Sequence, residues 1–235
     1  MPTNRWNQPV GPAVSDWLGC PTPAPTVLQG RHLRLEPLSC DAHAHDLFAA
    51  FDDPADAPAW TWMGYGPFAA PEQMQAWARW AEAGDDPLFF SWMVGGQALG
   101  FASLMRAMPD HGSIEIGHVA LAPALRRTRA ATEGFLLLMR HCFDTLGYRR
   151  LEWKCDALNG PSRVAADRLG FAYEGTFLAH LVVKGRRRDT AWFAITYETW
   201  PAVRAGLQHW LADDNFEDGV QQTDLRSCRA ALTAP

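Results

Sequence analysis

Hydrophobic positions along the chain recur with two periods, one typical of strands and one typical of helices. Alternating or continuously apolar runs predict strands at 32–38, 88–94, 98–105, 114–121, 150–155, 173–184 and 189–197. Apolar residues three or four apart predict helices at 71–81, 130–146, 161–169 and 203–211, and one from Asp41, as its N-cap, through Phe51. Gly147 and Gly170 follow two of these helices, as left-handed C-terminal residues do. This order predicts a mixed α/β sheet.

The first thirty residues differ from the rest because six prolines interrupt them. Proline fixes φ and lacks an N–H, so 1–30 is predicted to be an extended arm. Three apolar residues would hold this arm against the body: Trp6, Trp17 and Leu18. The main domain is expected at 31–200, and a C-terminal helix with a loose polar tail at 201–235. The arm and tail would cover the body or form the contact of a homodimer.

Composition and charge narrow the function classes. The 235 residues are 48% hydrophobic and 20% charged, with a net charge of −5, which is typical of a globular protein and disfavours nucleic-acid binding. The chain lacks an apolar run of about 18 residues and a signal-peptide core, so we expect no membrane span and a cytoplasmic location. Five scattered cysteines, and a His43/His45 pair that points apart on a helix, predict neither a disulfide framework nor a metal site.

The join between strand 114–121 and helix 130–146 carries the strongest chemical signal. Arg126, Arg127 and Arg129 lie immediately before the helix. Backbone N–H groups and the helix dipole converge at such a position, and the arginines add charge, so the join would bind an anion. The alternative is a solvated basic loop, and the residues alone leave both open.

Four motifs in order along 33–195 resemble the GNAT superfamily of acyl-CoA-dependent N-acetyltransferases. They are Glu115-Ile116-Gly117-His118, the turn from Arg126 to Glu133, Asn159-Gly160-Pro161-Ser162, and Arg168-Leu169-Gly170-Phe171 followed by Glu174-Gly175. The resemblance is greatest to the branch of ribosomal-protein N-terminal acetyltransferases (RimJ/RimL-like) and their small-molecule relatives. It implies an α/β fold with a mixed, largely antiparallel central sheet, a splayed strand pair and helices on both faces. It also implies acetyl-CoA as cosubstrate.

The resemblance further implies that acetyl-CoA enters between the splayed strands. Backbone groups of three residues would pair with its pantetheine arm like an added strand: Val119, Ala120 and Leu121. The phosphates would lie on the following turn and helix start: Arg126, Arg127, Thr128, Arg129, Ala130, Ala131 and Thr132. In the family pattern Arg/Gln-x-x-Gly-x-Gly/Ala, Arg129 stands where glycine is expected. That departure favours the alternative of a scaffold that binds acyl-CoA without catalysis.

Two residues match the family's N-x-x-S at the start of the next helix. The resemblance implies that the Asn159 amide binds pantetheine and that the Ser162 hydroxyl lies near the thiol. Helix capping is the alternative for both residues.

Acetyl transfer to an amine needs two proton movements, because the ammonium must lose a proton and the thiolate must gain one. Glu115 is the candidate base, since it matches the family's strand carboxylate and burial in an apolar strand would strengthen it as a base. A solvent-facing position in an alternating strand is the alternative. Ser162 is the candidate proton donor to the thiolate.

The amine acceptor has two candidate segments. One precedes the second helix, where the family usually builds its acceptor pocket: Trp60, Trp62 and Tyr65. The other is a late basic hairpin with an aromatic residue, which would hold a phosphate or carboxylate and stack on a planar group: Lys184, Arg188 and Trp192. An exposed turn beside core aromatics is the alternative for the hairpin. We expect a small amine, such as an aminoacyl nucleotide, amino acid or antibiotic, attacking directly in a ternary complex; a protein N-terminus is the alternative acceptor.

Overall fold

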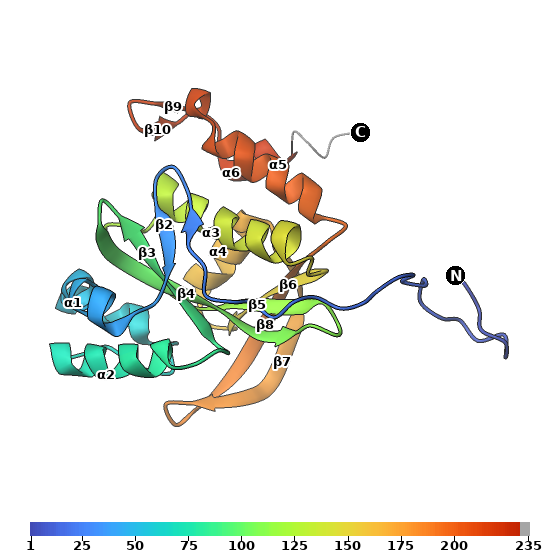
Figure 1. The fold of residues 1–235 in the computed structure, drawn as a ribbon, viewed down its shortest axis with the longest axis horizontal. Coiled ribbons are helices and arrows are strands. Elements are labelled where there is room, and N and C mark those ends of the chain that lie inside the picture. Colours follow the sequence, from blue (N-terminus) through green and yellow to red (C-terminus); the bar gives the residue numbers. More distant parts are fainter. Residues whose placement is uncertain (231–235) are drawn as a thin grey trace.

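The computed structural model describes residues 1–230, and an eight-stranded sheet forms its centre (Figure 1). In spatial order the strands are β1 (Leu28–Gln29), β2 (Arg34–Pro37), β3 (Leu88–Val94), β4 (Gln97–Met108), β5 (Ser113–Leu121), β6 (Arg150–Asp156), β8 (Arg186–Thr196) and β7 (Ala172–Val183). Neighbouring strands are antiparallel except for β5 and β6, which are parallel. The predicted mixed, largely antiparallel sheet is confirmed.

Helices cover both faces of this sheet, as predicted (Figure 1). On one face lie α1 (Cys40–Phe51), the 3₁₀ turn η1 (Pro54–Trp60) and α2 (Pro71–Glu82). On the other lie α3 (Arg129–Arg140), its π-helical extension η2 (His141–Thr145), α4 (Gly160–Leu169) and α5 (Trp200–Leu211). Because each face of the sheet is apolar where helices pack on it, two separate hydrophobic clusters form, one on each side.

The parallel strands β5 and β6 are paired only at their first residues. The three residues from Ser113 to Glu115 pair with the three from Arg150 to Glu152, and the pairing stops there. Beyond that point β5 pairs only with β4, and β6 only with β8. The two strands therefore separate, which confirms the predicted splayed pair and leaves an open edge along the end of β5.

The C-terminal segment is more ordered than the sequence predicts. After α5 come η3 (Asp213–Asn215), a hairpin of β9 (Phe216–Glu217) and β10 (Val220–Gln221), and α6 (Leu225–Ala230). Leu225 and Cys228 are buried in the main cluster, and the Asn215 side chain is buried and bonds backbone groups on both sides of the hairpin. The prediction of a loose tail is therefore wrong as far as residue 230. The end of the predicted tail, 231–235, lies outside the described residues.

The N-terminal arm contacts the body only in its second half. Trp17 Nε1 donates to the Asp110 carbonyl at 2.8 Å, and the Cys20 N–H donates to the Pro109 carbonyl at 3.1 Å. Trp6 and Leu18 are exposed, and the first residues project from the domain (Figure 1). Of the three apolar residues that were expected to hold the arm against the body, only Trp17 does so.

Most predicted boundaries hold within a few residues, with one correction at the start of α1. The helix begins at Cys40, so Ser39 and not Asp41 occupies the N-cap position. Ser39 makes no side-chain capping bond; its N–H donates to His43 Nδ1 at 3.0 Å instead. Among the described residues, no helix combines the length and apolar character that crossing a membrane requires.

Candidate active site

The end of β5 presents backbone groups to the opening beside β6. The Ala122 N–H donates to the Leu99 carbonyl at 2.9 Å, and the direction of backbone groups alternates along an antiparallel strand. The amide and carbonyl of Ala120 therefore face β4, whereas those of Val119 and Leu121 face the opening. Of the three residues expected to pair with pantetheine, two are placed to do so, and Ala120 is not.

The N-terminus of α3 lies next to this opening. Thr128 caps the helix by accepting the Ala131 N–H on its side-chain oxygen at 3.1 Å. The N–H groups of Arg129 and Ala130 belong to the first helical turn, which has no intrahelical acceptors. Arg127, just before the cap, has a left-handed backbone with φ 61°. This end of the helix therefore has unpaired N–H donors, the groups that the predicted anion site requires.

The three arginines of this loop differ in what their side chains do. Arg126 Nη1 and Nη2 contact both oxygens of Asp56 at 2.5 and 2.8 Å, and its Nε donates to the Leu121 carbonyl at 2.7 Å. The Arg129 side chain is bonded to Leu211 and Asp213, away from this site. Arg127 is exposed and has no ion-pair partner among the described residues. This corrects the expectation of three arginines at the anion site, because Arg127 alone has a free guanidinium.

The unusual Arg129 has its side chain directed away from the helix N-terminus. Its Nη2 donates to the Leu211 carbonyl and, at 2.7 Å, to Asp213 Oδ1. Its guanidinium also lies over the Phe216 ring, 4.3 Å from the centroid. Arg129 begins α3 with ordinary helical geometry, so the backbone here does not require glycine. The departure from the family pattern therefore serves as an anchor for the segment after α5.

Two further residues of the turn from Arg126 to Glu133, Thr132 and Glu133, make structural contacts. Thr132 is buried, and its hydroxyl accepts a bond from Arg168 Nη1 at 3.1 Å. The Glu133 carboxylate accepts the N–H groups of Arg31 at 2.9 Å and His32 at 2.7 Å, just before β2. These contacts hold the N-terminal half of α3 against its neighbours, so its free amides have a fixed position.

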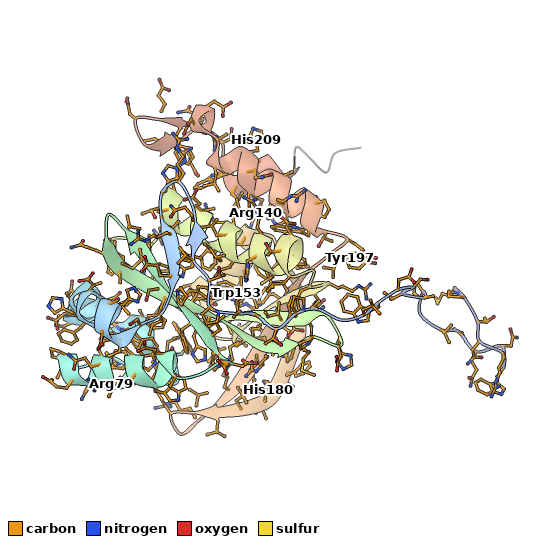
Figure 2. All side chains as sticks on the ribbon, in the orientation of Figure 1. Arg79, Arg140, Trp153, His180, Tyr197 and His209 are labelled. Carbon is orange, nitrogen blue, oxygen red and sulfur yellow. The ribbon has the colours of Figure 1, made fainter. Side chains whose placement is uncertain are left out.

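The start of α4 lies across the opening, where the Asn159 side chain caps the helix and the Ser162 side chain bonds β6 instead. Asn159 caps the helix by accepting the Ser162 N–H at 3.1 Å, which leaves its amide N–H groups unpaired among the described residues. Ser162 Oγ accepts a bond from Trp153 Nε1 at 2.9 Å; Trp153 lies near the centre of the molecule (Figure 2). Burial raises the pKa of the adjacent Cys155 thiol, and a hydrogen bond from Ser162 opposes that rise. The serine is thus a fixed hydroxyl facing β6.

Glu115 is buried at the last paired position before β5 and β6 separate. Its Oε2 contacts Arg106 Nη1 at 2.8 Å and Lys154 Nζ at 2.9 Å. Among the described residues, its other oxygen, Oε1, accepts no hydrogen bond. The burial expected for this residue is confirmed, and the alternative of a solvent-facing position is wrong. Two cations neutralise the charge of the buried carboxylate. Without such partners, burial of that charge would be strongly unfavourable.

The charges around Glu115 continue along β6. Lys154 Nζ also contacts Glu152 Oε2 at 2.6 Å, and Glu152 Oε1 accepts from Arg150 Nε at 2.8 Å. Burial alone would raise the pKa of Glu152, but the hydrogen bonds from Arg150 and Lys154 hold it below its ordinary value. The Lys154 ammonium lies 4.0 Å from the centre of the Trp192 ring on β8. Trp192 is thereby connected to the carboxylate at the base of the opening.

The two segments expected to hold the acceptor are joined by Lys184. At the turn between β7 and β8, its Nζ donates to the carbonyls of Trp60 and Gly66, each at 2.9 Å. This clasp fixes the loop that precedes α2 against the hairpin. The Lys184 ammonium has carbonyl partners, so its expected role in holding a substrate anion is replaced by a structural one.

The other acceptor candidates have different environments. Trp60 is buried in the α1–α2 cluster, which corrects its assignment to the pocket wall. Trp62 is half-buried. Arg188 Nε and Trp192 Nε1 are buried without a hydrogen-bond partner among the described residues. Trp192 also packs on Phe177, with 4.6 Å between ring centroids.

Tyr65 meets His118 of β5 on the α1–α2 side of the sheet. The Tyr65 hydroxyl and His118 Nδ1 are 3.0 Å apart, and the rings are nearly parallel with centroids 5.6 Å apart. His118 has φ 52° and lies where the β4–β5 register shifts, so a bulge turns its side chain out of the strand's alternation. Burial, with a smaller contribution from Arg106, lowers the pKa of His118 to about 4.

Several residues here were not predicted as site residues. The sequence indicates His118 only as the last residue of the Glu-Ile-Gly-His motif. Lys154 is predicted only as part of the strand at 150–155. A signal for Lys154 existed, because Arg150, Glu152 and Lys154 alternate with apolar residues in this strand and so share one face. His180 bonds Thr190 Oγ1 at 3.0 Å and is seen at the β7–β8 strands (Figure 2). No sequence pattern separates it from a surface residue.

Comparison with known proteins identifies the family. The sequence profile of the acetyltransferase (GNAT) domain matches residues 32–172. A GCN5-related N-acetyltransferase from Brucella melitensis is 43% identical, with a TM-score of 0.90 over 92% of this chain and 100% of that chain. A probable acetyltransferase of the GNAT family from Chromobacterium violaceum is 38% identical, with a TM-score of 0.77 over 83% of this chain and 98% of that chain.

A more distant similarity shows the fold alone. RimJ from Mycobacterium smegmatis, solved in complex with CoA-disulfide, is 23% identical, with a TM-score of 0.60 over 72% of this chain and 84% of that chain. A search of the curated proteins finds no match. The domain match and the two similar structures agree with the observed fold. The chain belongs to the GNAT family of N-acetyltransferases, which use acetyl-CoA as acetyl donor.

Proposed function

We propose that the protein transfers an acetyl group from acetyl-CoA to the primary amine of a small molecule, by direct attack within a ternary complex. One observation carries the proposal: the buried Glu115 lies where β5 and β6 separate, between the open backbone edge of β5 and a wall of polar and aromatic side chains, among them Lys154 and Trp192. A donor bound along the edge and an acceptor bound against the wall would meet at this residue.

The residues present fit acetyl-CoA. The unpaired N–H groups of Arg129 and Ala130 and the free Arg127 guanidinium would hold its phosphates. The edge groups of Val119 and Leu121 would pair with its pantetheine amides, and the free amide of Asn159 would bind the same arm. The Leu121 carbonyl already accepts Arg126, so its N–H is the available partner. When bound, acetyl-CoA supplies an activated thioester.

Two residues of this chain would manage the protons. Glu115 Oε1, which has no hydrogen-bond donor among the described residues, would take a proton from the acceptor ammonium directly or through water. The amine nitrogen then forms its bond to the acetyl carbon as the carbon–sulfur bond breaks. Ser162 Oγ accepts the Trp153 N–H and directs its own hydrogen to the Cys155 sulfur, so the hydroxyl would turn to donate that hydrogen to the leaving thiolate, and the second proton lost by the nitrogen would restore it.

A small acceptor suits this geometry better than a long peptide. The Lys184 clasp ties the loop before α2 to the β7–β8 hairpin and bounds the acceptor side. The net charge of −5 offers no general attraction to ribosomal RNA. Membership of the RimJ/RimL-like branch, and therefore acetylation of a protein N-terminus, is the alternative that the test must distinguish.

The first test is a calorimetric titration of the full chain with acetyl-CoA, with NADH as the matched negative control. Turnover is then measured by thiol release with a panel of amino acids and aminoacyl amides, beside peptides that begin with Ser, Ala or Thr. Acetyl-CoA binding with faster turnover of the small amines supports the proposal. Faster turnover of the peptides overturns the small-molecule assignment, and binding without any turnover favours the non-catalytic scaffold.

A further inference from the structure

His118 presents an unused hydrogen-bonding atom on the acceptor side of β5. A positive φ is uncommon for residues other than glycine, and the β-bulge holds His118 in this conformation. Tyr65 lies on one side of the ring and Phe89 at 5.0 Å between centroids on another. Such a constrained backbone and a ring packed between two aromatic residues indicate a side chain with a fixed orientation.

The contact with Tyr65 determines which imidazole nitrogen carries the proton. The phenol is buried, and burial raises its pKa, so it retains its hydrogen at neutral pH. A buried hydroxyl hydrogen without an acceptor is costly, and among the described residues His118 Nδ1 is the acceptor in reach. The hydroxyl therefore donates to Nδ1. The low pKa keeps the ring neutral, so its single proton resides on Nε2.

The Nε2–H group is free to meet a ligand. It has no hydrogen-bond partner among the described residues, yet it does not belong to the buried unpaired atoms, so solvent reaches it. His118 is three positions along β5 from Glu115, and Arg106 contacts Glu115 while influencing His118. Residues three apart on a regular strand point to opposite faces, but the bulge turns His118 to the face on which Glu115 lies, so Nε2 and Glu115 Oε1 lie on the same side of β5.

We propose that the His118 Nε2–H donates a hydrogen bond to the carbonyl or carboxylate oxygen next to the acceptor amine, so that the enzyme selects α-amino acyl compounds over plain alkylamines. This inference rests on the proposed function. An α-amino acyl group carries an ammonium and an oxygen acceptor on adjacent carbons. Glu115 would hold the ammonium, and His118 the oxygen, with the cations of Arg106 and Lys154 nearby to favour an oxygen over an alkyl group.

A matched pair of amines tests the selection. L-Phenylalaninamide and 2-phenylethylamine share an aromatic ring and a primary amine, but only the amide has the neighbouring carbonyl. The full chain should acetylate the amide with a kcat/KM about tenfold higher, the value expected for one well-placed hydrogen bond. His118→Asn keeps a group at the Nδ1 position and tolerates the positive φ, but lacks Nε2. It should bring the ratio close to one, whereas His118→Gln, whose amide reaches the Nε2 position, should restore part of it.

A second readout does not depend on turnover. In protein labelled with ¹⁵N-histidine, the imidazole nitrogen shifts should show the neutral Nε2–H tautomer of His118 at pH 7, and Tyr65→Phe should release it to a mixture of tautomers. An Nδ1–H tautomer overturns the inference. Equal kcat/KM values for the two amines, unchanged in His118→Asn, overturn it while the proposed function stands. Failure to acetylate either amine, although acetyl-CoA binds, overturns the proposed small-molecule function and this inference with it.

Discussion

The two sides of β5 are built from different kinds of groups. Toward α3, the groups available to a ligand are backbone N–H and C=O groups, and only one of three neighbouring arginines has a free side chain. Toward α1 and α2, they are side chains: a carboxylate, two cations, a histidine and aromatic rings. Backbone groups depend on fold and capping, so the donor side tolerates sequence change. Side chains define chemistry, so the acceptor side would determine specificity.

The largest effect of a substitution is expected at Glu115, a side chain of the acceptor side. Glu115→Gln removes the candidate base while keeping its shape, so kcat should fall about 100-fold, as is typical for loss of a general base. The dissociation constant of acetyl-CoA should change little, because the donor side is built from backbone. Steady-state kinetics and calorimetry measure the two quantities.

Glu152→Gln is the matched control for that experiment. It removes one of the two carboxylates that hold Lys154, without touching the residue proposed to accept the proton. If Glu152→Gln reduces kcat as much as Glu115→Gln, the charge cluster has a structural role and the base assignment is wrong.

The partly buried histidine of the acceptor side, His118, predicts a pH dependence of stability. The pKa of His118 is about 4 in the folded protein and near 6.5 when unfolded. Between these values the unfolded chain binds a proton that the folded chain does not, so stability falls as pH falls, by about 3 kcal/mol over the whole interval. Burial lowers the pKa of His141 too, with the same sign. Carboxylates whose pKa is lowered in the folded protein, such as Glu152, reduce the stability of the protein only at lower pH, where they become protonated.

Urea unfolding at pH 7, 6 and 5 measures this slope. His118→Asn should flatten it, whatever the absolute stability of the variant. A slope unchanged by the substitution would show that the ring is not buried in its neutral form.

On the donor side, Arg127 is predicted to matter more than its neighbours for ligand affinity. Arg127→Ala should weaken acetyl-CoA binding about tenfold by removing one charge-assisted contact to phosphate, with little change in Tm. Arg126→Ala should instead lower Tm, because it leaves the buried Asp56 without its partner. Calorimetry and thermal unfolding of both variants would contradict this contrast if the two effects were exchanged.

Local pattern predicted the elements well and their partners poorly. Alternation and helical spacing placed the hairpin of β3 and β4 and the long helix 130–146 within a few residues, because each pattern is set by neighbours in the chain. The pairing of Arg126 with Asp56, seventy positions away, and of Lys184 with the carbonyls of Trp60 and Gly66 depends on how the sheet folds back.

The candidate site divides in the same way. The cap at Asn159 and the burial of Glu115 follow from residue type and position on an element, and the sequence indicated both. Thr128 caps α3, a role that was not predicted for it. The bulge that turns His118 toward Tyr65 is a register shift between two strands, which no local pattern encodes. The order of the C-terminal segment was missed because its few buried apolar residues, Leu225 and Cys228, pack against a core formed by distant parts of the chain.

The smallest effect is expected at Arg129, and it tests the backbone half of the comparison most directly. If the family's glycine served close approach of the backbone to phosphate, Arg129→Gly would strengthen acetyl-CoA binding. Here the guanidinium points to Asp213 and Phe216, and the amide that faces the anion site is unchanged by the substitution. We therefore expect an acetyl-CoA dissociation constant within about twofold of wild type, and a loss of stability of about 1 kcal/mol from the lost anchor.

Asp213→Asn is the matched control, because it weakens the same anchor and leaves the residue at position 129 intact. Both variants should lower Tm modestly and leave affinity unchanged. An increase in affinity specific to Arg129→Gly would mean that the side chain obstructs the phosphate loop. The donor side would then depend on side chains as much as the acceptor side does, and the contrast between the two sides of β5 would fail.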